Sequence, residues 1–189
     1  MKKGLLIVVS GPSGVGKGTI LSSFVDDPEM KIAYSVSMTT RGMREGEVDG
    51  VNYFFTTVDQ FKDAIKAGKM LEYTVYSGNY YGTPLEYVEK LRSEGKNVLL
   101  EIEIDGAKQI RAKCPEVVSI FITPPSFAEL AARLKGRGTE TDEEIDRRLA
   151  IAETELQNAY TYRYVICNDK LETACDIVRH IIEAHMKEE

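Results

Sequence analysis

The stretch of sequence that decides the fold runs from Leu5 to Thr19 and reads LLIVVSGPSGVGKGT. Its first five residues form a continuous apolar run, which is typical of a strand buried on both faces. A turn containing three glycines follows, and from Lys17 onward the apolar residues recur at helical spacing. A strand, a glycine-rich turn and a helix in this order form the opening of a βαβ unit.

The turn itself carries a chemical signature. Gly11 and Gly16 frame the pattern G-x-x-x-x-G-K, which ends at Lys17 and is that of a phosphate-binding loop, or P-loop. Glycines let backbone N–H groups turn toward phosphate oxygens, and the start of the helix adds a partial positive charge. Lys17 can reach the terminal phosphates as a point charge. Because the motif lies between a strand and a helix, it predicts a nucleoside triphosphate site rather than an ordinary turn.

One position departs from this pattern. The residue after the lysine is usually Ser or Thr, whose hydroxyl binds Mg²⁺, but here it is Gly18, and Thr19 comes next. Glycine has no side chain that could coordinate a metal. We therefore expect Mg²⁺ to be held by phosphates, by water and by a more distant acid. Glu101, at the end of an apolar strand, is the candidate to bind Mg²⁺ through water.

The rest of the chain alternates between predicted strands and helices. Apolar runs predict strands at 31–37, 98–104, 117–122 and 164–167. This alternation predicts an α/β fold with a central parallel sheet in three layers, as in P-loop proteins. Short strands at 53–55 and 70–76, and a turn at 77–82, interrupt the rhythm. We expect a single domain of three parts: a core (about 1–36, 88–125 and 161–189), an inserted lobe of short strands (about 37–87) and a helical lid (about 126–160).

Several helix starts have the spacing of a capping box, in which Ser or Thr precedes Glu or Gln by three residues. These segments are Thr57–Gln60, Thr83–Glu86 and Ser126–Glu129, and Thr141–Glu144 is expected to start a further helix.

Composition excludes several classes of protein. The 189 residues are 43% hydrophobic and carry a net charge of −6, which suits a folded domain but not a broad nucleic-acid-binding surface. No apolar run is long enough to span a membrane. Three cysteines, of which Cys167 is expected in the core, and two histidines form no disulfide framework or metal spacing. We expect a cytoplasmic protein.

Further motifs indicate which nucleotides the protein binds. Residues 37–53, SMTTRGMREGEVDGVNY, resemble the nucleotide-acceptor motif of guanylate kinases, and Glu72 with SGNYYGT at 77–83 resembles its second half. The segments TPPS at 123–126 and GRGTET at 136–141 resemble the lid region of that family. These blocks keep the order of the family and cover nearly the whole chain. The resemblance implies transfer of the γ-phosphoryl group of ATP to GMP, giving ADP and GDP, in purine nucleotide metabolism and GMP recycling.

The resemblance also assigns residues to each ligand. Those expected to bind ATP are Gly11, Pro12, Ser13, Gly14, Val15, Gly16, Lys17, Gly18, Thr19 and Asn168, the last at the adenine. Those expected to bind GMP are Ser37, Arg41, Arg44, Tyr53, Glu72, Tyr81, Thr83 and Glu103. The residues expected to stabilise the transferred group are Lys17, Arg41, Arg133, Arg137 and Arg148.

The chemistry of these residue types is consistent with such a reaction. Arg41 and Arg44 lie in a glycine-containing loop, where each guanidinium can bind a monophosphate through two hydrogen bonds. Guanine presents two adjacent donors, its N1–H and its exocyclic amine, and the carboxylate of Glu72 can accept both. Adenine lacks this pair of donors and would leave the carboxylate unpaired.

The chain also departs from the family in places, and two other functions stay open. Glu101 and Glu103 replace aspartates that are more usual in the family, Met38 replaces a polar residue, and Gly42-Met43 replaces a stretch with proline. The first alternative is a protein-binding domain of the guanylate-kinase type, but such domains typically lose the P-loop or the lid arginines. The second is a nucleotide kinase or P-loop NTPase for another phosphorylated acceptor. The oligomeric state is not indicated by the sequence.

Overall fold

The computed structural model describes residues 2–136 and 141–188, and its centre is a parallel sheet of five strands. The strand order is β2-β7-β1-β8-β9, and every neighbouring pair runs parallel. The strands are β1 (Leu6–Ser10), β2 (Ile32–Tyr34), β7 (Asn97–Glu101), β8 (Val118–Thr123) and β9 (Tyr164–Cys167). The predicted α/β fold with a central parallel sheet is confirmed.

The apolar run that opens the chain builds the core on both faces of this sheet. Ile7 and Val9 of β1 pack in one hydrophobic cluster, while Leu6 and Val8 pack in another. The first cluster includes α1 (Lys17–Ser22) and α7 (Leu171–Glu188), and the second includes α3 (Leu85–Ser93) and α4 (Ile104–Lys113). Successive side chains of a strand point to opposite faces, so a strand that is apolar at every position must be covered by helices on both sides.

A second sheet lies between β2 and α3 in the chain, with the order β4-β3-β6-β5. Its strands are β3 (Met38–Thr39), β4 (Phe54–Phe55), β5 (Met70–Tyr76) and β6 (Asn79–Pro84), and α2 (Val58–Lys66) follows β4. The turn predicted at 77–82 is shorter than expected, because only Ser77 and Gly78 connect β5 to β6. Both residues have positive φ angles, 49° and 78°, as the two central residues of a tight hairpin require.

Two helices follow β8, and a short 3₁₀ turn leads into the last strand. They are α5 (Phe127–Lys135), α6 (Asp142–Leu156) and the turn at Ala159–Thr161. The capping contacts predicted at Thr57 and Ser126 are present, and the helix expected to start at Thr141 begins with a capping box. The one predicted at Thr83 is absent, because its hydroxyl is bonded elsewhere and Pro84 stands at the N-cap of α3. Cys167, expected in the core, is exposed at the end of the edge strand β9.

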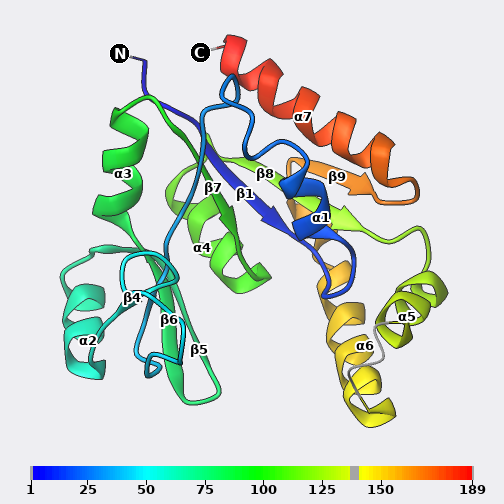
Figure 1. Ribbon diagram of the computed structural model, residues 1–189, viewed down its shortest axis with the longest axis horizontal. Helices are drawn as coiled ribbons and strands as arrows, with labels where there is room; N and C mark the ends of the chain where they lie inside the picture. The colour runs from blue at the N-terminus through cyan, green and yellow to red at the C-terminus, as the bar shows by residue number, and fades with distance from the viewer. Residues whose placement is uncertain (1, 137–140, 189) are drawn as a thin grey trace.

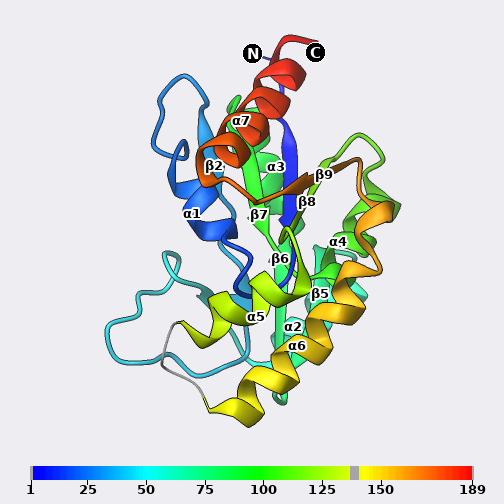
Figure 2. The same ribbon diagram turned by 90° about the vertical axis from the view of Figure 1, so that its right-hand side faces the viewer.

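The second sheet with α2 and the pair α5–α6 extend from the same end of the core (Figure 1). Figure 2 shows that both termini lie at the opposite end. The carboxyl ends of β1, β7 and β8 point toward the two extensions, and this is where ligands bind in open α/β sheets. None of the helices among the described residues is long and apolar enough to cross a membrane.

Candidate active site

The P-loop forms the strand-to-helix turn that the sequence predicts. Gly16 stands at the N-cap of α1 with a φ of 97°, in the left-handed region that glycine adopts without strain. The ammonium of Lys17 donates to the carbonyls of Gly11, at 2.6 Å, and Pro12, at 3.2 Å. The lysine therefore lies along its own loop, with its charge at the place where phosphate oxygens are expected.

Two residues predicted to bind the nucleotides, Asn168 and Arg133, hold the P-loop in place. Asn168, which is buried, donates from its amide to the carbonyl of Val15 at 2.8 Å. Arg133 of α5 donates to the Asn168 carbonyl at 3.0 Å and pairs with Glu129 at 3.1 Å. Both side chains thus fix the position of the loop. Contact of Asn168 with adenine, and of Arg133 with the transferred group, stay predictions.

Gly18 occupies an open position on the first turn of α1. A Cβ atom built on it meets no other atom within 4 Å. A serine or threonine would fit at this position, so the absence of the usual hydroxyl is not forced by packing.

Two adjoining cavities lie at the carboxyl edge of the core sheet. The first, of about 430 Å³, is lined by Lys17 and by Arg148 of α6. The second, of about 360 Å³, is lined by Glu72 and by Tyr81 of the second sheet. The cavities share the residues that form their common boundary: Tyr76, Glu101, Ile102 and Glu103. A donor phosphate at the P-loop and a second ligand near Glu72 would therefore face each other across a short boundary.

Glu72 of β5 is the buried acid of the second cavity, with 4% of its surface exposed. Its Oε1 accepts a hydrogen bond of 2.6 Å from the hydroxyl of Thr83, on the neighbouring strand. Burial raises the pKa of this carboxyl, while the hydrogen bond from Thr83 and the charge of Lys113 oppose the shift. A carboxylate that is costly to bury is a strong site for donors that can replace its water.

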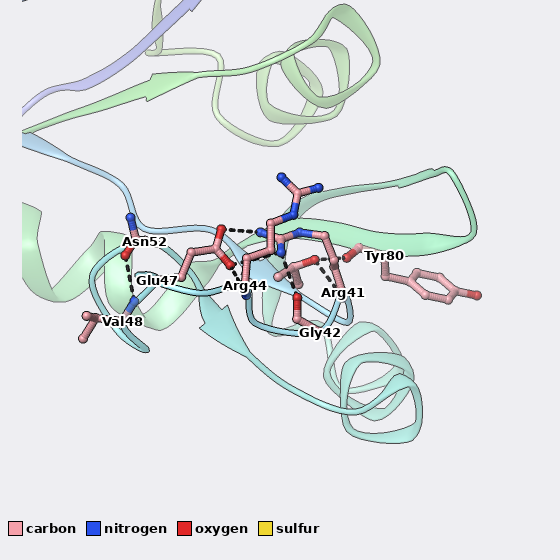
Figure 3. Close-up of polar contacts among 8 residues, drawn as sticks. Arg41, Gly42, Arg44, Glu47, Val48, Asn52 and Tyr80 are labelled. Carbon is pink, nitrogen blue, oxygen red and sulfur yellow. Dashed lines mark hydrogen bonds and ion pairs between the residues drawn. The ribbon is translucent and has the colours of Figure 1, made fainter.

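The loop after β3 holds Arg41 in a fixed orientation through a residue that sequence reasoning missed. The two carboxylate oxygens of Glu47 accept hydrogen bonds from Arg41, at 2.6 and 3.0 Å, and one of them also accepts the backbone N–H of Arg44, at 2.8 Å (Figure 3). The ion pair raises the pKa of Arg41 and lowers that of Glu47. The sequence signal that could have revealed Glu47 is an acid three residues after the second of two loop arginines.

Arg41 makes further contacts besides the ion pair with Glu47. Its Nη1 hydrogens go to Glu47 and to the carbonyl of Gly42, and one Nη2 hydrogen goes to Glu47. A side-chain hydrogen bond with Tyr81 also raises the pKa of Arg41, so at most one of the five guanidinium hydrogens is left for a further acceptor. The guanidinium also lies over the ring of Tyr53, 5.3 Å from its centroid. Figure 3 shows that the guanidinium of Arg44 extends away from Glu47.

The remaining predicted acceptor residues gather around the second cavity. Tyr53 and Tyr81 pack edge to face with ring centroids 6.1 Å apart, and Ser37 and Glu103 line the same cavity. On the other side, Glu155 of α6 lines the first cavity, and burial raises its pKa while Lys17 opposes the shift. Glu155 is a second residue that sequence reasoning missed. Arg137, predicted to contact the transferred group, lies outside the described residues.

Among the described residues, the acids near the P-loop do not form a complete metal site. Within residues 2–136 and 141–188, no group of three His, Cys, Asp or Glu side chains is arranged to hold a metal ion. Glu101 and Glu103 line the first cavity together with Lys17. This arrangement fits Mg²⁺, which commonly binds one or two carboxylates together with substrate phosphates and water.

Comparison with known proteins agrees with this geometry. The sequence model of the family described as guanylate kinase matches residues 3–185. The crystal structure of guanylate kinase from Anaplasma phagocytophilum is 32% identical, with a TM-score of 0.71, over 98% of this chain and 87% of that chain. The structure of TT1252 from Thermus thermophilus shares the fold at 14% identity, with a TM-score of 0.54, over 97% of this chain and 98% of that one.

A P-loop at the carboxyl edge of a parallel sheet, with a second cavity beside it, defines a nucleotide phosphotransferase. The match of the family model over residues 3–185 identifies the family within this class. The chain belongs to the guanylate kinase family.

Proposed function

We propose that the protein transfers the γ-phosphoryl group of ATP to GMP, giving ADP and GDP. The observation that carries this proposal is the buried carboxylate of Glu72 in a cavity that adjoins the P-loop cavity. One of its oxygens is already paired with Thr83, so the carboxylate is held in place for the N1–H and the exocyclic amine of guanine. Adenine offers no such pair of donors and would leave a buried charge unpaired, which costs about 1–3 kcal/mol.

We assign the acceptor phosphate to the loop after β3, which carries Arg41 and Arg44. Arg41, oriented by Glu47, and Arg44 would each bind phosphate oxygens, and the phenols of Tyr53 and Tyr81 would add neutral donors. The guanosine would then lie in the second cavity, which Ser37 and Glu103 also line, while Thr83 would act through its hydrogen bond to Glu72. The acceptor needs no general base, because a phosphate oxygen is already an anion.

The donor phosphates are assigned to the P-loop. Its backbone N–H groups and Lys17 would hold the β- and γ-phosphates of ATP, and Lys17 would exchange its bonds to Gly11 and Pro12 for phosphate oxygens. Arg148, and Arg133 and Arg137 on the predicted lid, would stabilise the charge that spreads over the equatorial oxygens of the transferred group. Mg²⁺, held by phosphates and through water by Glu101, would neutralise phosphate charge. We place this reaction in the cytoplasm.

A substrate panel tests the proposal. ADP production is measured at saturating ATP with GMP, AMP, UMP or CMP as the acceptor. We expect turnover with GMP at a kcat/KM about 5- to 150-fold above that with AMP, the ratio to which 1–3 kcal/mol corresponds. Equal use of GMP and AMP would refute the assignment and favour a kinase for another acceptor. Absence of turnover with every acceptor would favour a protein-binding domain.

A further inference from the structure

The strand that carries Glu72 lies at an edge of the second sheet, and its outer side faces the core. β5 is last in the order β4-β3-β6-β5, so among the described residues it has a single strand partner. An edge strand exposes a row of backbone donors and acceptors that need other partners. Helix α4 of the core supplies them from Gln109 and Lys113, which lie four residues apart on one side of the helix.

Gln109 makes hydrogen bonds to both backbone groups of Tyr73, the residue that follows Glu72. Its amide nitrogen donates to the Tyr73 carbonyl at 2.8 Å, and its amide oxygen accepts the Tyr73 N–H at 3.2 Å. One side chain thus makes the pair of hydrogen bonds that an antiparallel strand would make to the same residue. The backbone at Tyr73 is therefore fixed to α4.

Lys113 fixes the backbone on the other side of Glu72. Its ammonium donates to the carbonyls of Met70, at 3.1 Å, and Leu71, at 2.8 Å. The pairing of β5 with β6 shifts register between Met70 and Glu72. At such an irregularity the strand pairing alone does not define the direction of the next side chain, so the contacts from α4 gain importance.

The same side of α4 also limits where the carboxylate can lie. A Cβ atom built on Gly106 would come within 2.6 Å of Oε2 of Glu72. Gly106 is three residues before Gln109, so both belong to one side of the helix. The carboxylate is thus enclosed between the hydroxyl of Thr83 and the backbone of α4.

We infer that Gln109 and Lys113 are positioning residues for base selection, which hold the backbone on both sides of Glu72 so that its carboxylate meets both donors of guanine. The inference rests on the proposed function and deepens it. In this inference helix α4 of the core orients Glu72, although Glu72 itself belongs to the second sheet.

The test compares GMP with IMP, whose base keeps the N1–H but lacks the exocyclic amine. The ratio of kcat/KM for GMP to that for IMP therefore reports whether Glu72 accepts both donors. In Gln109→Leu and in Lys113→Met we expect this ratio to fall about tenfold, which corresponds to about 1.4 kcal/mol, with the KM for ATP changed less than twofold. Lys113→Arg keeps the donors and should restore the ratio. Lys108→Ala, an exposed position on the same helix, is the matched control and should leave it unchanged.

Specific outcomes overturn the inference. An unchanged ratio in folded Gln109→Leu and Lys113→Met does so, as does an equal loss with GMP, IMP and ATP, which would indicate only a loosened fold. If Gln109→Leu does not fold, the pair Lys113→Met and Lys113→Arg decides, since a ratio that fails to recover in Lys113→Arg also counts against it. A wild-type protein without preference for GMP over AMP instead overturns the proposed function, and the inference with it.

Discussion

At the scale of single residues, the buried carboxyl of Glu72 links selectivity to stability. Its pKa is raised above the ordinary value of 4.5 by burial. Such a group contributes stability that is fully present below the unfolded-state pKa and is lost as pH rises through the folded-state pKa. Ionising this mostly buried acid in the folded protein therefore costs stability as pH rises. The site that would read guanine is thus a local weakness of the fold in the absence of ligand.

The substitution Glu72→Gln should separate these two effects. Glutamine keeps an acceptor for Thr83 but carries no charge, so we expect the free energy of unfolding at pH 7 to rise by about 1 kcal/mol. The gain should shrink as pH falls toward 4.5, because the wild-type carboxyl then becomes neutral. The kcat/KM for GMP should fall by two orders of magnitude or more, while the KM for ATP stays near the wild-type value. Urea unfolding at several pH values and steady-state kinetics measure both effects. A variant that is less stable at pH 7 would contradict this account of the burial cost.

The carboxyl of Glu72 also predicts how kcat/KM for GMP changes at acidic pH. Guanine donors need the ionised form, so kcat/KM for GMP should fall as pH drops through the folded-state pKa, at a midpoint above 4.5. Lys113 favours the ionised form and Glu103 opposes it. The acceptor phosphate titrates as well, near pH 6, and Glu72→Gln isolates its contribution. Identical profiles for wild type and Glu72→Gln would show that Glu72 does not control this limb.

At the scale of elements, the hairpin between β5 and β6 has a strained turn. Ser77 has a φ of 49°, which costs a residue with a side chain about 1–2 kcal/mol, whereas asparagine tolerates it better. Followed by glycine, asparagine gives the favoured sequence of this hairpin turn.

We expect Ser77→Asn to stabilise the protein by about 0.5–1 kcal/mol, and the β-branched Ser77→Val to destabilise it. The midpoint of urea unfolding measures both changes. Equal midpoints for the two variants would argue that the turn is not in this conformation in solution.

Prediction from sequence succeeded where the local pattern determined the element. The apolar run of β1 and the glycine-rich turn required only neighbouring residues, and the Thr57 capping box also formed as its spacing indicates. The strand β6 was missed because its assignment depends on pairing with β5 and on a serine in a conformation that favours glycine or asparagine. Thr83 was assigned to a helix cap, but the distant Glu72 provides its partner. The support of β5 by Gln109 is likewise a contact over 36 residues, which no local pattern reveals.

At the scale of the whole molecule, the two cavities should make global stability depend on ligands. A ligand that binds only the folded state at one hundred times its Kd adds about 2.7 kcal/mol, which corresponds to a rise in Tm of roughly 5–11 °C for a chain of this size.

We expect GMP and ATP each to raise the Tm, and Glu72→Gln to abolish the shift with GMP while keeping the shift with ATP. Differential scanning calorimetry at fixed ligand excess measures these shifts. Loss of both shifts in this variant would indicate that the two cavities are not separate binding sites.

The end of the molecule away from the cavities has a practical consequence. Lys2 donates to the carbonyl of Met186 at 3.0 Å, so the first described residues lie beside the last helix, and Figure 1 places both at the far end of the core. A peptide tether, a dye or a solid support attached at either terminus would stand away from the entrance for nucleotides. The protein could therefore be immobilised or joined to another enzyme through either end, with its catalytic face open to solution.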